Sequence, residues 1–467
     1  MFSGSPLNRL SWLRPSHAFL NALVNSPATR WMLFNAGQPL VSARPESKNR
    51  DLAFLSTKDV SSLLGPEPFF GQGQTEGDLV ALRGDGETHK EEGPLEAIRH
   101  RGPRVVFLGL LQPEGVTEAL PSSEFTDPLP AVARLEGTPY FAIDVADLEG
   151  ELVDRGLKES ALEGVELSWS EPRAMMTALD ALHGGMFAEA RSLVDWNTRN
   201  QFCPACGSPT YSLWGGWKIS CSAILPWWNN EGRKPCPTVK GLHNFTHPRT
   251  DPVVIMIAID ESGDKILLGR NKKFPGKFYS ALAGFIEPGE SFEDAVVREM
   301  WEEAGVKVWN VAYHSGQPWP FPANLMVGFY SRADSSQPIR VDLDNELQDA
   351  RWYTREEILA VLNHQSGTYF SARDHKVMSS LQENRNNLQS DSNQSTGAAA
   401  LAHSDPSIQA AEKPVENSIP ASDMEPPFRL PPVTAIAGVL IRDWATGKIG
   451  FGASADSIVA NVPRGNL

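Results

Sequence analysis

The sequence predicts an α+β protein made of an N-terminal mixed, mainly β domain, a small cysteine module and a C-terminal α/β/α sandwich. Segments of strand length alternate with turns over residues 1–195, and four cysteines cluster within residues 199–248. Beyond residue 251, strand-like segments surround one strongly marked helix. A chain of 467 residues has room for about two to four such domains.

In the N-terminal domain, three segments have the β-branched and aromatic content of strands: residues 30–40, 104–111 and 140–145. Residues 171–197 change to a helical pattern, with apolar side chains three or four positions apart. This domain contains no motif that carries chemistry. The sequence therefore favours a scaffold or dimerisation role for residues 1–195.

The chain has only four cysteines, and all of them fall in the second module: Cys203, Cys206, Cys221 and Cys236. The first two form a Cys-x2-Cys pair, which is typical of structural zinc sites. A module this short needs a metal or disulfide staple, and an intracellular chain disfavours disulfides. We therefore expect a zinc ribbon, with disulfides or free thiols as the alternative. An inserted loop separates the last two cysteines, so His243 or His247 could replace Cys236 as the fourth ligand.

The third domain, residues 251–460, contains several segments of strand length: residues 253–259, 266–268, 279–282, 325–330 and 350–352. Residues 379–427 are rich in Ser, Asn, Gln, Ala and Pro, and such a composition predicts a disordered insertion. The apolar pattern resumes with a helix at residues 434–444. We expect this helix to return to the third domain.

The helix expected over residues 292–304 has a start signal and a stop signal. Ser291 can cap it, and Asp294 three positions later completes a capping box. Gly305 suits the left-handed conformation that ends a helix. Arg298 and Glu290 are expected to pair and to hold the preceding loop against the helix.

The carboxylates of this helix do not lie opposite its apolar stripe, as they would on a surface helix. Phe292, Ala295 and Val296 define one apolar face, and Val297 and Trp301 form a second. Three acids continue along the first face: Glu299, Glu302 and Glu303. Carboxylates packed this closely repel one another, so they require cations, and hard divalent ions such as Mg²⁺ suit them.

This segment resembles the Nudix box, Gly-x5-Glu-x7-Arg-Glu-U-x-Glu-Glu-x-Gly-U, where U is a bulky aliphatic residue. Every specified position is present: Gly284, Glu290, Arg298, Glu299, Met300, Glu302, Glu303, Gly305 and Val306. The resemblance implies a Nudix α/β/α sandwich that hydrolyses a nucleoside diphosphate derivative with Mg²⁺ or Mn²⁺. It implies metal ligation by Glu299 and Glu303, assistance from Glu302, and a catalytic role for Arg298. By the same analogy Glu303 also serves as general base.

A proline-rich loop over residues 316–324 resembles the Ser-Gln-Pro-Trp-Pro-Phe-Pro-x-Ser motif of the NADH pyrophosphatase subfamily. Gly316 and Asn324 replace the two serines, and Trp319 and Phe321 are placed where they could stack on a flat ring. The resemblance implies substrate contacts by the whole run: Gln317, Pro318, Trp319, Pro320, Phe321, Pro322, Ala323 and Asn324. This subfamily also has a zinc ribbon before its Nudix domain, which supports zinc at the cysteines. The resemblance covers residues 1–195 more loosely, as an NADH-pyrophosphatase-like scaffold domain.

Other roles carry over from the subfamily position by position. Glu346 matches a further metal carboxylate, and Ala283 matches a backbone ligand of the metal. Ala437 matches a backbone contact to substrate, and Phe285 is placed to stack on the nicotinamide. The subfamily also implies a homodimer.

The function predicted from this resemblance is hydrolysis of NADH to NMNH and AMP, with NAD⁺ as a slower substrate. The same chemistry on the 5′ end of NAD-capped RNA would release the cap as NMN. The alternatives are an ADP-ribose or coenzyme A diphosphatase and a non-catalytic nucleotide sensor. A net charge of −15 argues against nucleic-acid binding by bulk electrostatics.

The sequence contains no apolar run near the roughly 18–20 residues that cross a membrane, so no membrane partner is expected. The N-terminus lacks the apolar stretch of a secretory signal. The last residues, Gly465, Asn466 and Leu467, differ from the Ser-Lys-Leu peroxisomal signal. We expect a soluble intracellular protein of the cytoplasm or the peroxisome.

Overall fold

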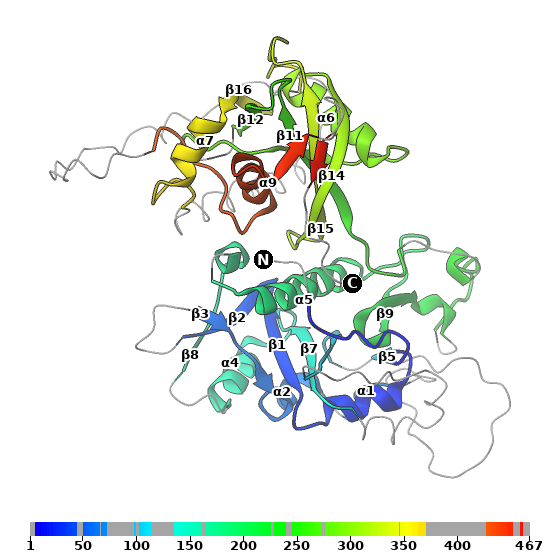
Figure 1. Ribbon diagram of the computed structural model, residues 1–467. Helices are drawn as coiled ribbons and strands as arrows, with labels where there is room; N and C mark the ends of the chain where they lie inside the picture. Colours follow the sequence, from blue (N-terminus) through cyan, green and yellow to red (C-terminus); the bar gives the residue numbers. More distant parts are fainter. Residues whose placement is uncertain are drawn as a thin grey trace, which may run out of the picture. The chain divides into compact units, whose positions relative to one another are not determined.

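The computed structural model describes most of the chain between residues 5 and 460. The described residues are 5–43, 50–65, 67–71, 98–99, 102–113, 135–160, 165–176, 178–225, 228–239, 245–272, 274, 276–344, 346–369, 426–451 and 458–460. The insertion predicted at residues 379–427 lies almost wholly outside them. The chain divides into two compact units, the first formed by Met1–Val253 with Gly316–Met326 and the second by Val254–Ser315 with Val327–Leu467 (Figure 1).

The first unit is built on a mixed sheet in which five strands follow the order β3-β2-β1-β7-β6, while β4 pairs with β1 and β8 with β2. Strand β1 runs parallel to β7 and antiparallel to β2. The strands are β1 (Arg30–Asn35), β2 (Gln38–Ala43), β3 (Arg50–Leu52), β4 (Leu55–Ser56), β6 (Val105–Leu111), β7 (Thr138–Asp144) and β8 (Glu166–Trp169).

Helices cover both faces of this sheet: α1 (His17–Val24), α2 (Thr57–Leu64), α4 (Gly150–Glu159) and α5 (Ala181–Arg199) (Figure 1). Side chains of β1 alternate between two hydrophobic clusters, as the two-residue period of a strand requires. Trp31 and Leu33 pack in a cluster with α1 and α2, whereas Met32 and Phe34 pack in a cluster with α5. The N-terminal domain is therefore mixed, as predicted, and has a larger helical share than "mainly β" implied.

Two predictions for the N-terminal domain were too coarse. The single strand predicted at residues 30–40 is a hairpin of β1 and β2, which turns at Ala36 and Gly37 with φ of 48° and 76°. The helix predicted at residues 171–197 is broken. A 3-10 turn, η2 (Pro172–Met176), precedes α5, which begins only where Asp180 accepts from the N–H of His183.

The cysteine module is a small antiparallel sheet in which β9 (Thr210–Leu213) pairs with β10 (Lys218–Cys221) and with β5 (Ile98–Arg99). Three 3-10 turns accompany it: η3 (Trp214–Gly216), η4 (Ser222–Ile224) and η5 (Pro237–Val239). The tight turn at Gly216, where φ is +87°, packs against β6. A Cβ there would lie 2.9 Å from Val106 Cγ2, so the close approach requires glycine.

The second unit contains a sheet in the order β14-β15-β11-β12-β16, with β13 also paired to β11. Its strands are β11 (Asp251–Ile259), β12 (Lys265–Asn271), β13 (Leu282–Phe285), β14 (Val308–Trp319), β15 (Asn324–Ala333) and β16 (Leu347–Thr354). Its helices are α6 (Phe292–Ala304), α7 (Arg355–Leu362) and α9 (Ile436–Ala445), and a hairpin of β17 (Ile449–Phe451) and β18 (Ile458–Ala460) follows.

Both helices predicted for this unit, at residues 292–304 and 434–444, are confirmed as α6 and α9. Strand β14 was not predicted. The strand expected at residues 279–282 lies slightly later, at Leu282–Phe285. No helix within the described residues is both long enough and apolar enough to cross a membrane.

The two units share one strand order. In the second unit it is β14-β15-β11-β12-β16, and in the first unit the corresponding path is β6-β7-β1-β2-β8. The side pairing corresponds as well, because β13 pairs with β11 and β4 pairs with β1. In each unit, the side-paired strand is followed by a helix, which is α6 in one and α2 in the other. The first unit thus repeats the topology of the second.

Candidate active site

Helix α6 begins and ends where the sequence predicted. Ser291 and Asp294 form a capping box, and Gly305 adopts the left-handed conformation with φ of 67°.

The predicted apolar faces of helix α6 are only partly correct. Ala295 and Val296 are buried, but Phe292, on the predicted core face, is 42% exposed. Val297 and Trp301 are similarly exposed. The buried side of the helix also includes the side chain of Glu303.

Arg298 links the loop before α6 to the carboxylates on the helix. Its Nε and Nη2 donate to the two oxygens of Glu290, at 2.5 and 2.9 Å, as the sequence predicted. Its Nη1 donates to Glu299 at 2.7 Å and to Glu302 at 2.9 Å. Its Nη2 also donates to the carbonyl oxygen of Phe285. Hydrogen bonds from Arg298 hold the pKa of Glu290 at about 2. This arginine, whose side chain is 21% exposed, therefore orients three acids.

Gly284 makes room for the carboxylate of Glu299. A Cβ built at Gly284 would lie 1.9 Å from the carboxyl carbon of Glu299 and about as close to both of its oxygens. A side chain at this position would force the Glu299 carboxylate to move. The first glycine of the box thus allows the observed position of a glutamate fifteen residues later. Burial raises the pKa of Glu299, and the charges of Glu302 and Glu346 add to this against the opposing effect of Arg298.

Glu303 is the most deeply buried acid of the cluster, with 3% of its surface exposed. The backbone N–H of Ala283 donates to its Oε1 at 3.2 Å. Burial raises the pKa of Glu303 well above its usual value, and repulsion from Glu299, Glu346 and Asp344 adds to the effect. Glu346, predicted from the resemblance alone, is therefore near enough to act on Glu299 and Glu303 electrostatically.

This donor set fits a divalent cation. Several carboxylates repel one another around a buried glutamate whose only hydrogen-bond donor is a single N–H among the contacts that the structure describes. A hard cation with oxygen ligands would reverse this repulsion. The carboxylates are spaced more openly than the cysteines. Within the described part of the chain, only the cysteines bring three or more ligand atoms within 4.8 Å of one another.

The proline-rich loop connects β14 to β15 and belongs to the first unit. Phe321 is buried in that unit, with Arg173 Cζ 4.4 Å and Arg191 Cζ 5.1 Å from its ring centroid. Arg191 donates to the carbonyl oxygen of Pro320, and Ser192 donates to that of Pro322 at 3.3 Å. Phe321 thus anchors the loop on helix α5, and its stacking on a substrate ring stays a prediction.

The remaining predicted substrate contacts lie in varied surroundings. Phe285 is 57% exposed, as a residue available for stacking must be, and Ala437 is buried in α9. Trp319 meets the ring of Phe321 edge to face at 5.2 Å. Gln317 is buried. Three further loop residues line a cavity of the first unit: Pro318, Ala323 and Asn324.

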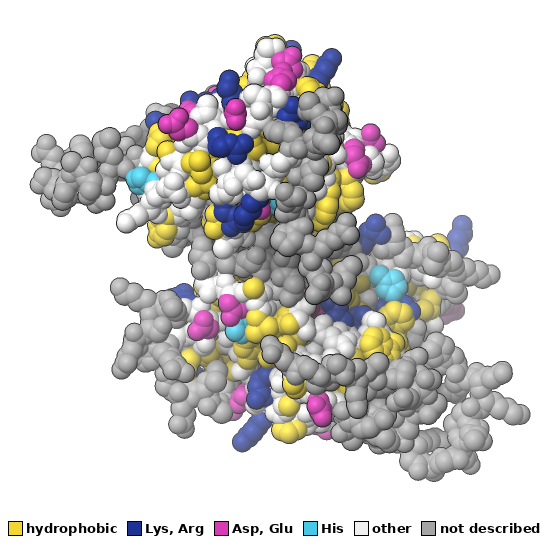
Figure 2. Space-filling view, viewed as in Figure 1, with side chains coloured by type: hydrophobic (Ala, Val, Ile, Leu, Met, Phe, Trp, Pro, Cys, Tyr) yellow, Lys and Arg dark blue, Asp and Glu magenta, His cyan; other side chains and the backbone are white. Residues whose placement is uncertain are grey.

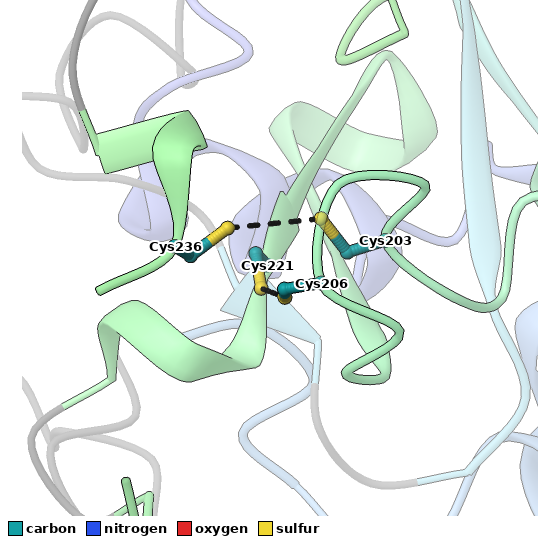
Figure 3. A group of neighbouring side chains, drawn as sticks. All are labelled: Cys203, Cys206, Cys221 and Cys236. Atoms are coloured by element: carbon teal, nitrogen blue, oxygen red, sulfur yellow. Dashed lines mark hydrogen bonds between the residues drawn. The ribbon is translucent and has the colours of Figure 1, made fainter. Parts of the chain in front are cut away.

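All four cysteines converge on one point (Figure 3). The Sγ atoms of Cys203 and Cys236 are 3.8 Å apart, and those of Cys206 and Cys221 are 3.4 Å apart. Sulfurs bound to one tetrahedral zinc are about 3.8 Å apart, whereas a disulfide joins them at about 2 Å. Cys236 thus completes the set. His247 instead faces the ring of Trp214, and His243 lies outside the described residues.

Comparison with known families finds a match in two regions of the chain. Residues 249–372 match the NUDIX domain, and residues 28–196 match the NADH pyrophosphatase-like rudimentary NUDIX domain. The NAD-capped RNA hydrolase of Schizosaccharomyces pombe is 34% identical over 364 residues, which cover 77% of this chain and 85% of the relative. The chain belongs to the Nudix hydrolase family.

Two other relatives of this Nudix hydrolase are also named NAD-capped RNA hydrolases. NAD-capped RNA hydrolase NPY1 of Saccharomyces cerevisiae is 32% identical over 386 residues, covering 79% of this chain and 88% of the relative. NAD-capped RNA hydrolase NUDT12 of Homo sapiens is 47% identical over 191 residues, covering 41% of this chain and 39% of the relative. The family membership predicted from the box and the proline-rich loop is confirmed. Sequence reasoning missed that the N-terminal domain is itself a rudimentary Nudix domain.

Proposed function

We propose that this Nudix hydrolase cleaves the pyrophosphate of NADH and NAD⁺, giving AMP with NMNH or NMN, and removes NAD caps from RNA. In this reaction water adds its oxygen to one phosphorus and the bridging P–O bond breaks. The observation that carries the proposal is the buried Glu303, which is surrounded by the like charges of Glu299 and Glu346. The relatives named NAD-capped RNA hydrolases support the choice of substrate.

The chain's own residues have separable roles in this proposal. Burial raises the pKa of Glu303, and a higher pKa makes its carboxylate a stronger proton acceptor, which suits a general base. Arg298 holds Glu299 and Glu302 in place through one hydrogen bond from its Nη1 to each carboxylate. The exposed ring of Phe285 would stack on the nicotinamide, and the backbone at Ala437 would contact the substrate.

Mg²⁺ or Mn²⁺, when bound, would neutralise the pyrophosphate and lower the pKa of a bound water. The residues that would hold it are Glu299, Glu302, Glu303 and Glu346, together with the backbone of Ala283. Zinc at the four cysteines would have a structural role, because its four thiolates leave no position open for a substrate.

RNA would be recognised mainly through its cap. On the face drawn in Figure 2, basic and acidic side chains are interspersed among the described residues of both units, without one broad basic patch. A net charge of −15 agrees with this. The proposed partners are therefore a dinucleotide, free or at an RNA 5′ end, and a second copy of the chain in a homodimer.

Product analysis of the purified protein with NADH and Mg²⁺ tests the proposal. We expect AMP and NMNH from the wild type, and a loss of at least about 100-fold in kcat for Glu303→Gln. Glu293→Gln is the matched control, because Glu293 is an exposed acid in the first turn of the same helix. Cleavage of ADP-ribose in place of NADH would overturn the proposed substrate and keep the Nudix mechanism. If no diphosphate is cleaved, the alternative of a non-catalytic nucleotide sensor becomes the leading hypothesis.

A further inference from the structure

A cavity of about 340 Å³ lies within the first unit. Helix α5 forms one wall, and the proline-rich loop forms another with Pro318 and Asn324. Arg9, Trp217 and the segment just before β11 contribute the rest of the lining. The acidic residues of α6 are not part of it. The cavity has the volume of a small ligand site.

Glu189 of α5 lines this cavity, and its side chain is 3% exposed. One carboxylate oxygen, Oε2, accepts from Ser5 Oγ at 2.9 Å and lies 3.2 Å from Arg9 Nη2. The other oxygen, Oε1, is buried and has no hydrogen-bond partner among the residues that the structure describes. A buried acceptor without a donor is costly. A ligand that brings an amino group into the cavity would remove this cost.

The mouth of the cavity is basic. The Arg9 side chain is 45% exposed, with its guanidinium 5.1 Å from the ring centroid of Trp217. Arg249 and Thr250 also line the cavity, and both are exposed. Two guanidinium groups beside a hydroxyl suit a phosphate. The cavity thus combines a buried acceptor with two arginines, one of which, Arg9, also pairs with Glu189.

We propose that this cavity binds one nucleoside monophosphate unit. An amino group of the base would donate to Oε1 of Glu189, and the phosphate would face Arg9 and Arg249. The bound nucleotide is either free, such as AMP, or part of the RNA chain behind the cap. The second source rests on the proposed decapping function, and the first does not.

Two variants test the site from different sides. Glu189→Gln places a donor where the base needs an acceptor, and Thr250→Trp narrows the mouth from an exposed position. Asp195→Asn is the matched control, because it removes a carboxylate from the same helix without lining this cavity. Calorimetry with AMP at pH 8, above the pKa of about 7 of Glu189, counts the nucleotides bound per chain. Kinetics with NADH and with NAD-capped RNA are measured on the same full-length proteins.

If the site takes a free nucleotide, both variants bind one AMP fewer per chain than the wild type and the control. If it takes a nucleotide of the RNA, kcat/KM for capped RNA falls on the order of 10-fold while the NADH rate stays within about 2-fold. Folded variants that leave both quantities unchanged would overturn the proposal. So would a change only in oligomeric state, which would make the cavity a contact between copies. If the wild type does not cleave NADH, the proposed function is wrong. AMP binding would still show whether the cavity binds a nucleotide.

Discussion

The two Nudix-like units share a topology but differ in the helix that follows the side-paired strand. Both helices begin with a capping box, formed by Ser56 with Asp59 in α2 and by Ser291 with Asp294 in α6. Beyond the first turn they diverge. Helix α2 has eight residues and buries only apolar ones, whereas α6 has thirteen and buries Glu303.

Counting from the first residue of each helix shows what the first unit lacks. Leu63 and Leu64 of α2 stand where α6 has Arg298 and Glu299. Helix α2 ends before it reaches the positions of Glu302 and Glu303. The strand order survives without these side chains, because it depends on the apolar faces of the sheet and not on the carboxylates. Fold and box residues are therefore separable in this chain, because the first unit keeps the strand order without the acidic residues of the box.

The largest expected effect concerns Gly284, which has no counterpart in the first unit because α2 directly follows β4. In Gly284→Ala the added methyl group would overlap the Glu299 carboxylate and displace it. We expect kcat/KM for NADH to fall by about 100-fold or more, because misplaced catalytic groups lose positioning. Gly289→Ala in the preceding turn is the control, since a Cβ there meets no atom within 4 Å. The left-handed φ at Gly289 affects stability, so both rates are taken relative to folded protein. Equal losses in both variants would contradict this account.

Loss of the cysteine cluster should affect stability more than chemistry. Cys221 is buried beside Cys206, so Cys221→Ser removes one of four thiols that converge. We expect about one zinc per chain in the wild type and much less in the variant, by elemental analysis. The melting temperature should fall by several degrees, with kcat per folded chain nearly unchanged. A full loss of kcat in the folded variant would assign the metal to catalysis and contradict a structural role.

The two units also contain contrasting buried glutamates. Glu303 has acids as neighbours, whereas Glu189 has Arg9 and Arg14. Burial raises the pKa of Glu189 to about 7 despite both arginines, because Arg9 is half exposed and its charge is screened. The folded chain therefore holds a proton that the unfolded chain releases near pH 4.5. The contribution of Glu189 to stability is present below pH 4.5 and is lost as the pH rises to about 7.

This loss is on the order of 3 kcal/mol for a pKa rise of this size. We expect Glu189→Gln to be more stable than the wild type at pH 8, and to gain nothing at pH 4.5. Chemical denaturation at the two pH values measures the difference. A gain of the same size at both values would show that the charge of Glu189 is not its cause.

The sequence predicted the second unit better than the first for a physical reason. Local signals at Ser291 and Gly305 determine α6, so it was predicted at its observed bounds. The proximity of Glu346 to Glu303 depends on strand pairing, which no local pattern reveals, and only a family resemblance predicted it. The hairpin at Gly37 was missed because the β-branched, aromatic and other apolar residues on both sides of its turn were interpreted as one strand. The likeness between units was missed because strand order leaves no residue signature once the box is gone.

The smallest expected effect tests the feature that both units share. Ser56→Ala and Ser291→Ala each remove an N-cap whose side chain accepts from the third helical N–H. We expect each to cost about 1 kcal/mol. In calorimetry this lowers a transition by roughly 2–4 °C for a unit of this size. If the units unfold independently, each variant should shift a different transition, and only Ser291→Ala should reduce kcat, because its helix alone carries the carboxylates. A single transition lowered equally by both variants would show that the two units, separable in chemistry, unfold as one.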